Sequence, residues 1–336
     1  MTEDPLLKIR DLSVAFRTSL GAAEAVSGVD LDLADGEVLG LVGESGSGKS
    51  VAMKAIMGLL PPRAETTGAV HFRGRDLLQT SEREMRRLRG GRIAMVFQDP
   101  LTAFNPVVTI GDQIAEMIRL HDRSMSNARL KDRIVELLEL VSIPEAGARA
   151  GAYPHELSGG MRQRAMIAMA LANDPELLIA DEPTTALDVT VQAQILDVLR
   201  DLQTRLGIGL ALVTHDLGVV AGMADRVAVM YAGRIVEQAP VDTLFADPRH
   251  PYTRGLIAAV PRLDRTEERL TGIEGTPPSL LSRPSGCAFA PRCPMAARQC
   301  REVRPALEPA GHSLAACHFA DGPPAHAPAH TEETPR

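Results

Sequence analysis

The stretch of sequence that decides the fold reads Gly43-Glu44-Ser45-Gly46-Ser47-Gly48-Lys49-Ser50. It fits the pattern G-x-x-x-x-G-K-[ST], follows the wholly apolar run 38–42 and opens an apolar helical pattern at Val51. Glycines let the backbone curl so that its N–H groups face phosphates, and the start of the following helix adds positive potential. In such a loop the lysine reaches the β- and γ-phosphates, and the serine hydroxyl ligates Mg²⁺. The sequence therefore predicts a nucleoside triphosphate site.

Two carboxylates, Asp181 and Glu182, follow a second apolar run at 177–180. The carboxyl ends of neighbouring parallel strands meet at one edge of a sheet, so we expect these side chains beside the phosphate loop. Asp181 would hold Mg²⁺ through its water shell, and Glu182 would polarise the attacking water. A strand that ends in Asp-Glu is by itself usually an ordinary turn. The phosphate loop upstream favours the catalytic interpretation.

Short apolar runs alternate with helical patterns up to about residue 240. The apolar runs are 38–42, 93–97, 177–180 and 208–213, and the helical patterns are 110–120, 130–141, 161–172 and 191–206. Runs without polar members are typical of strands buried on both faces of a parallel sheet. Alternation at Val29, Leu31 and Leu33 indicates an added antiparallel part. The predicted fold class is α/β, a P-loop nucleotide-binding core around a mostly parallel sheet.

The composition excludes several classes of protein. The chain has 336 residues, a net charge of −7, seven Phe, three Tyr and no Trp. An acidic balance and few aromatic side chains argue against a protein that coats nucleic acid or stacks its bases. No stretch approaches the ~18–20 apolar residues of a spanning helix, and the N-terminus lacks the basic and apolar regions of a secretory signal. We therefore expect a cytoplasmic chain.

The composition changes after Gln238, where prolines become frequent. All the cysteines of the chain follow within 31 positions, at Cys287, Cys293, Cys300 and Cys317. Disulfides are uncommon in the cytoplasm, so this cluster favours a four-thiolate metal site. Its spacing matches neither zinc ribbons nor ferredoxins and leaves the metal open. We predict a core at 1–240, a small metal-binding module at 241–320 and a disordered Pro/Ala/His/Thr-rich tail at 321–336.

A second phosphate-facing helix start is predicted at Leu157-Ser158-Gly159-Gly160-Met161. One chain does not need two such sites for one γ-phosphate, so this loop is expected to close on the nucleotide of another subunit. With this loop the sequence resembles the ATP-binding subunits of ABC transporters, over about residues 6–320. The resemblance implies a helical subdomain at about 100–175 and two ATPase subunits arranged head to tail. Met161 stands where the family usually has Gln.

The resemblance implies roles for residues at matching positions. Phe16 would stack on adenine, although it shares the spacing of a strand core with Leu12 and Val14. Gln98 would sense Mg²⁺, Asp188 in Ala186-Leu187-Asp188 would lie at the seam of the ATPase pair, and His215 would contact the γ-phosphate. The implied catalytic residues are Glu182, His215 and Gln98; the ATP-binding residues are Phe16, Gly43, Glu44, Ser45, Gly46, Ser47, Gly48, Lys49 and Ser50; the Mg²⁺ residues are Ser50, Gln98 and Asp181.

Segments 98–106, 250–254 and 286–294 narrow the resemblance to the ATPase subunits of oligopeptide and dipeptide importers. This implies ATP hydrolysis that powers peptide import by a peripheral subunit on the cytoplasmic face of the membrane. The implied partners are two permease subunits, a second ABC ATPase (a related chain or a second copy) and an extracytoplasmic substrate-binding protein, with no nucleic acid. Nickel, glutathione or another small solute is the alternative cargo. A non-transport ABC ATPase is disfavoured by the single phosphate loop and the lack of sustained heptads.

For Cys287, Cys293, Cys300 and Cys317, the resemblance implies a [4Fe–4S] cluster. Zinc is the alternative, with His312 and His318 as spare donors. Without a metal, the four would be separate buried thiols. The expected role of a metal is to keep the module at 241–320, called the C-terminal extension below, folded, because that region has few long apolar runs.

Overall fold

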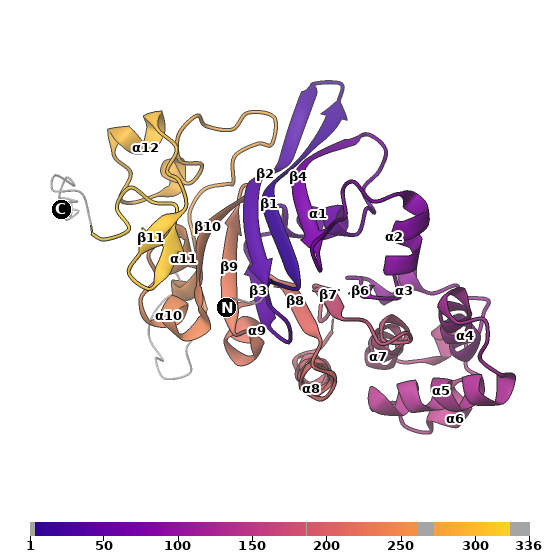
Figure 1. Ribbon diagram of the computed structural model, residues 1–336. Coiled ribbons are helices and arrows are strands. Elements are labelled where there is room, and N and C mark those ends of the chain that lie inside the picture. Colours follow the sequence, from indigo (N-terminus) through magenta and orange to yellow (C-terminus); the bar gives the residue numbers. More distant parts are fainter. Residues whose placement is uncertain (1–3, 186, 261–271, 323–336) are drawn as a thin grey trace.

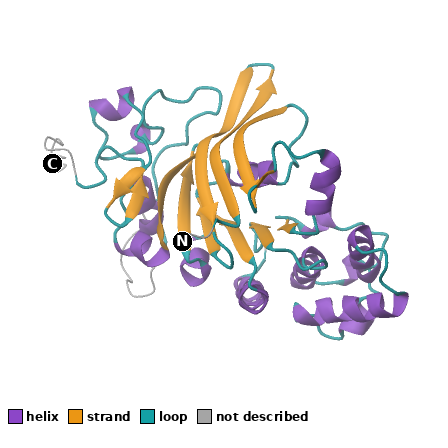
Figure 2. Cartoon of the chain, viewed as in Figure 1, coloured by secondary structure: helices purple, strands orange, loops and turns teal. Residues whose placement is uncertain are grey.

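The structure is a computed structural model and describes residues 4–185, 187–260 and 272–322. In these ranges the larger sheet has eight strands in the order β11-β12-β10-β9-β3-β8-β7-β6 (Figures 1 and 2). Strands β9, β3, β8, β7 and β6 run parallel, whereas β10, β12 and β11 continue the sheet antiparallel. The strands are β3 (Val38–Val42), β6 (Ile93–Val96), β7 (Leu177–Asp181), β8 (Gly209–Thr214), β9 (Arg226–Tyr231), β10 (Arg234–Pro240), β11 (Glu308–Ala310) and β12 (Ser313–Ala315).

A second, antiparallel sheet lies over one face of the first and has the order β2-β1-β4-β5 (Figure 1). Its strands are β1 (Leu7–Thr18), β2 (Gly21–Leu33), β4 (Ala64–Phe72) and β5 (Arg75–Asp76). Helix α1 (Lys49–Ile56) lies between the sheets, and its Ile56 is buried with Leu41 of β3 and Val70 of β4. This shared core fixes the start of α1, and with it the phosphate loop, against the parallel strands.

The remaining helices lie around the large sheet (Figure 1), and one of them buries Met85 and Leu88 in the core between the two sheets. They are α2 (Glu82–Leu88), α3 (Pro100–Ala103), α4 (Ile110–His121), α5 (Asn127–Leu140), α6 (Ala146–Arg149), α7 (Gly159–Ala170), α8 (Val189–Leu206), α9 (Leu217–Met223), α10 (Val241–Ala246), α11 (Pro251–Ala258) and α12 (Arg298–Glu302), with 3₁₀ turns at Pro154–Glu156 and Ala290–Arg292. Helices α3 to α7 form a helical lobe beside β6 (Figure 1). No helix in the described ranges is long and apolar enough to cross a bilayer.

The predicted elements are present, and their ends differ for identifiable reasons. The run 38–42 coincides with β3, but β6 ends at Val96 and leaves Phe97 37% exposed. Helix α5 begins at Asn127, three residues before the first apolar position of its pattern, because the Ser126 side chain caps its N-terminus. Capping residues, not the first apolar residue, set where such helices begin.

The C-terminal extension is joined to the large sheet. Strand β12 pairs with β10, with Glu237 opposite Ala315, and Ala316 N–H donates to the Val236 carbonyl. The extension therefore continues the sheet at its edge. Most of the predicted tail, residues 323–336, lies outside the described residues.

Candidate nucleotide-binding site

Four loops gather at one edge of the large sheet. They follow β3, β8, β7 and β6, which are consecutive neighbours in the sheet. The loop after β3 is the phosphate loop, and His215 lies directly after β8. The Asp181-Glu182 pair lies at the end of β7, and Gln98 lies shortly after β6. The carboxyl ends of adjacent parallel strands are the usual ligand-binding edge of an α/β fold. We call this set of loops the catalytic edge.

The phosphate loop curls tightly before α1. Gly48 has φ +105°, and a Cβ there would lie 2.5 Å from the Ala25 carbonyl oxygen. Lys49 Nζ donates to the carbonyls of Gly43 (2.7 Å) and Glu44 (3.1 Å). Burial lowers the pKa of Lys49, while the Glu182, Asp181 and Glu44 carboxylates favour its charge. The lysine thus places a buried positive charge at the centre of the loop, where phosphates would be bound.

Oxygen ligands suited to Mg²⁺ lie beside this lysine. Ser50 Oγ donates to Asp181 Oδ1 at 2.7 Å, and Asp181 is 2% exposed. Burial raises the pKa of Asp181, whereas the hydrogen bond from Ser50 lowers it by a smaller amount. Mg²⁺ is usually held by one or two protein oxygens together with the phosphates of a nucleotide. Ser50 and Asp181 fit that donor set.

Glu182 is the meeting point of three loops. Its Oε2 accepts hydrogen bonds from Gln98 Nε2 and Thr185 Oγ1, both at 3.0 Å, and lies 3.5 Å from His215 Nδ1. Its backbone has φ +48°, and its N–H donates to the Val213 carbonyl. Left-handed backbone at a non-glycine residue is costly and is concentrated at functional sites. The three residues predicted as catalytic, Glu182, His215 and Gln98, therefore lie together, and Thr185, which the sequence did not single out, orients Glu182.

The second phosphate-facing loop begins α7. Ser158 Oγ accepts from Met161 N–H at 3.3 Å, and a Cβ at Gly160 would lie 2.6 Å from Val191 of α8. Leu157 is buried and Gly159 opens the helix. Within the described residues, no hydrogen bond links 157–161 to the phosphate loop of the same chain.

Two other predicted residues have structural contacts. Asp188 caps α8 by accepting from Val191 N–H at 3.0 Å, whereas Ala186 lies outside the described residues. Phe16 lies in β1 opposite Ala64 and is half-buried against the core between the sheets. Adenine stacking by Phe16 therefore stays a prediction.

Two side chains of the C-terminal extension contact Glu44 of the phosphate loop. The Arg292 guanidinium makes a two-pronged ion pair with the Glu44 carboxylate at 2.8 and 2.9 Å, and the Arg292 side chain is only 5% exposed. The Glu44 N–H donates to the hydroxyl of fully buried Tyr252 at 2.8 Å. The rings of Tyr231, Tyr252 and Phe289 pack with centroids 4.6–5.4 Å apart. Arg292 and Tyr252 lie in segments that the resemblance included, but their contact with the loop was not predicted.

The four cysteines line one small cavity of the extension, together with His318. Burial raises the pKa of the Cys287, Cys293 and Cys317 thiols, that of Cys293 to about 11. Within residues 4–185, 187–260 and 272–322, no three His, Cys, Asp or Glu side chains are arranged so that they could hold a metal ion. The predicted metal-binding character of the extension is therefore unsupported by this arrangement, although the thiols share one cavity.

Family models match two parts of the chain: "ABC transporter" at residues 26–185 and "Oligopeptide/dipeptide transporter, C-terminal region" at 236–300. A solved dimeric post-hydrolysis state of the ATP-binding cassette MJ0796, bound to ADP and Pi, matches with a TM-score of 0.63. The two sequences are 28% identical, and the matched region covers 70% of this chain and 98% of the MJ0796 chain.

Relatives match over nearly the whole chain. The dipeptide transport ATP-binding protein DppD of Bacillus subtilis is 51% identical over 304 residues, which cover 90% of each protein. The oligopeptide transport ATP-binding protein OppD of Mycobacterium tuberculosis is 53% identical over 304 residues, and the chain spans only about half of its length, 50%. The fold, the ordered motifs and these similarities show that the chain belongs to the ABC transporter ATP-binding proteins, in the oligopeptide/dipeptide family.

Proposed function

We propose that the chain is the ATP-hydrolysing subunit of an ABC importer of dipeptides or oligopeptides. The observation that carries this proposal is the set of contacts around Glu182. Its carboxylate lies beside Gln98 and His215, next to the Ser50–Asp181 pair. Such a carboxylate can orient and deprotonate an attacking water, and Lys49 with the Mg²⁺ that Ser50 and Asp181 would hold can neutralise charge on a transferred phosphoryl group.

The roles of the residues follow from where they lie. Lys49 and the loop N–H groups would bind the β- and γ-phosphates, and Mg²⁺ bound through Ser50 and Asp181 would supply further positive charge. Glu182 would act as the base, held by Thr185 and Gln98. His215 is 60% exposed and would contact the γ-phosphate. Gln98, Glu182 and His215 closely follow the ends of buried strands, which place them before the reaction begins.

Assembly as a head-to-tail pair of ATPase subunits is part of the proposal. The helix start at 157–161 makes no hydrogen bond with its own phosphate loop among the described residues, which leaves it available to a second subunit, either a copy or a related chain. The helical lobe beside β6 would transmit nucleotide binding through Gln98 to two permease subunits. The chain would then be peripheral on the cytoplasmic face, with an extracytoplasmic binding protein delivering cargo.

Peptide cargo is supported by the family match at 236–300 and by the names of the relatives. Nickel, glutathione and another small solute are the alternatives. The test is reconstitution of the chain with its permease and binding-protein partners in lipid vesicles. We expect ATP hydrolysis to be stimulated by binding protein loaded with a di- or oligopeptide. Stimulation by nickel or glutathione alone would contradict the cargo, and absence of hydrolysis in the complete complex would contradict the ATPase.

We also propose that the four cysteines hold a [4Fe–4S] cluster, with zinc as the alternative. The support is the convergence of four thiols on one cavity and the preference of thiolates for such metals. A bound metal would offset the cost of burying thiolates there. The test is anaerobic purification followed by iron, sulfide and zinc analysis. Iron and sulfide in equal molar amounts would support the cluster. Zinc without iron would show that zinc occupies the site instead, and a metal-free chain would contradict both assignments.

A further inference from the structure

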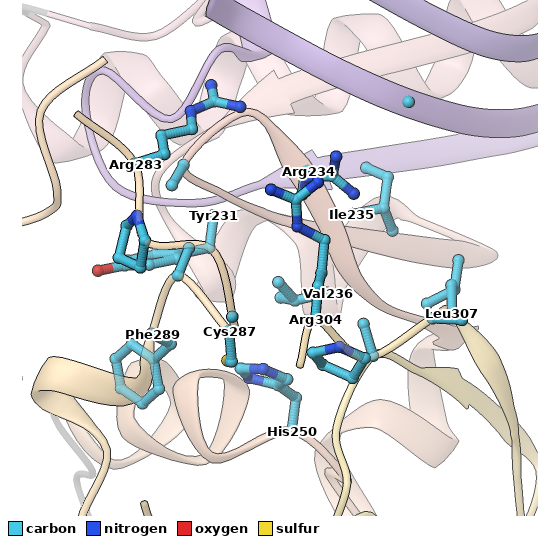
Figure 3. A pocket seen from close by; sticks show the side chains of 18 of the residues that line it. Tyr231, Arg234, Ile235, Val236, His250, Arg283, Cys287, Phe289, Arg304 and Leu307 are labelled. Carbon is cyan, nitrogen blue, oxygen red and sulfur yellow. The ribbon is translucent and has the colours of Figure 1, made fainter. Parts of the chain in front are cut away.

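A cavity of about 270 Å³ lies between β10 and the C-terminal extension. Tyr231, Ile235, Phe289 and Leu307 give it an apolar wall. Arg234, Arg283 and Arg304 also line it, and Figure 3 shows these arginines around the cavity with the apolar side chains. The space exceeds that of several water molecules, each of which occupies about 30 Å³ in the liquid. It is large enough for a small organic anion.

Positive charge at this cavity exceeds the negative charge that faces it. Arg283 pairs with Glu24 at 3.1 Å, whereas Arg234 donates to the neutral Ser27 hydroxyl at 2.7 Å. Arg304 makes no hydrogen bond or ion pair with any described residue. The carboxylate of Asp30, a further lining residue, accepts the Asp11 N–H at 2.8 Å.

Two of the arginines that line the cavity also have a donor atom that the protein encloses and that has no partner in the described part of the chain. The Nε atoms of Arg234 and Arg283 are buried and have no hydrogen-bond partner among the described residues, and the Arg283 side chain is 9% exposed. Burial lowers the pKa of Arg234, and the nearby charges of Arg304 and Arg283 lower it further. The Glu24 and Asp11 carboxylates act in the opposite direction and raise this pKa. Three arginines close together, faced only by Glu24 and Asp30 in the ranges that the structure describes, repel one another at a cost in free energy. An anion in the cavity would remove that cost.

We propose that this cavity is a binding site for a phosphate group carried by a small apolar or neutral molecule. Arginine forks match phosphate oxygens in geometry, and a phosphate group offers several cations more oxygen acceptors than a carboxylate does. The apolar wall would take the remainder of the molecule. The phosphate could belong to a soluble ester or to a phospholipid headgroup. The bound anion would bridge β10 and the extension, because Arg234 lies in β10 whereas Arg283 and Arg304 lie beyond it.

The soluble arm of the test measures binding of inorganic phosphate and glycerol 3-phosphate by calorimetry. The full chain is first saturated with Mg²⁺ and ADP, so that the phosphate loop is filled. The variant is Arg304→Glu, and the matched control is Arg301→Glu, which alters an arginine that is also exposed but lies outside the cavity. We expect glycerol 3-phosphate to bind the chain, and Arg304→Glu to lower its affinity about tenfold or more, the effect of losing a charged hydrogen bond. The control should stay within about twofold.

The lipid arm measures co-sedimentation with phosphatidylglycerol vesicles against phosphatidylcholine vesicles. Binding that needs the anionic lipid and is lost in Arg304→Glu but kept in Arg301→Glu would assign the phosphate to a headgroup. The proposal is overturned if neither arm shows binding, or if both variants behave alike. Thermal unfolding and ADP binding of each variant show that it is folded, and Arg304→Gln repeats the test without a charge reversal. Because ADP binding to the phosphate loop is measured separately, failure of this site is distinguishable from failure of the nucleotide site.

Discussion

Glu44 belongs to the catalytic edge and is contacted by the C-terminal extension, but these two regions are built differently. At the catalytic edge, regular parallel strands place each functional side chain, because the strand ends are fixed by the buried sheet. In the extension the helices and strands are short; besides the pairing of β12 with β10, side-chain contacts join it to the core, above all Arg292 with Glu44 and the ring cluster around Tyr252. The first arrangement follows from topology. The second depends on a few contacts, so single substitutions there should alter the phosphate loop from a distance.

The largest effect is expected where chemistry depends on one group of the catalytic edge. Glu182→Gln keeps the shape of the side chain but removes the base, so hydrolysis should fall about 10²–10⁴-fold while ATP still binds. Steady-state hydrolysis and equilibrium ATP binding measure the two parts. The control is Glu136→Gln, on the exposed face of α5, which should change neither. Near wild-type hydrolysis in Glu182→Gln would remove Glu182 from the role of base.

The thiols of the extension give the next largest effect. Burial raises the pKa of Cys293 to about 11 in the metal-free chain, about two units above an ordinary thiol, so its thiolate is scarce at neutral pH. Alkylation at pH 7 should therefore be about a hundredfold slower than that of a free cysteine and should rise about tenfold per pH unit up to pH 10.

Mass spectrometry after timed alkylation measures this rate. The control is the same chain purified with any bound metal, in which a ligated thiolate should stay protected at every pH. A rate in the metal-free chain that levels off near pH 8 would show that Cys293 is not held in a buried environment. The pH profile thus separates burial from ligation as the cause of protection.

Arg292→Met tests whether the extension positions the phosphate loop. The change leaves the Glu44 carboxylate without its two-pronged partner, which should lower the free energy of unfolding by about 2 kcal/mol. ATP should bind about tenfold more weakly, because the loop loses a constraint that orders it before binding. Denaturant unfolding and ATP titration measure both quantities.

The matched control is Arg298→Met, which removes an ion pair of a 90% exposed arginine with Glu302 and should change stability by less than about 0.5 kcal/mol. A double variant with Glu44→Gln separates coupling from packing, since the cost of Arg292→Met should shrink once Glu44 is neutral. Equal costs in both backgrounds would show that the ion pair does not position the loop.

The sequence predicted the catalytic edge better than the extension, for a physical reason. The loop at 43–50 and the run 177–180 carry local patterns whose spatial meeting follows from the rules of parallel sheets. Nothing local indicates that Arg292, 248 residues from Glu44, would pair with it. Likewise, β12 is three residues long, too short to predict from periodicity, yet it joins the extension to β10 of the large sheet. Contacts that join distant segments through single side chains leave no periodic signal.

The smallest effect should come from Tyr252→Phe, which isolates one hydrogen bond of the extension with the phosphate loop. The ring, with its packing against Tyr231 and Phe289, is kept, but the Glu44 N–H loses its acceptor at 2.8 Å. Loss of one such bond should cost about 1 kcal/mol of unfolding free energy and only a few-fold in ATP affinity, less than Arg292→Met. Denaturant unfolding and ATP titration again give both values. A cost equal to that of Arg292→Met would mean that Tyr252, not the ion pair, dominates the hold on the loop; no change at all would mean that the N–H finds another acceptor, and that the ion pair alone carries the connection.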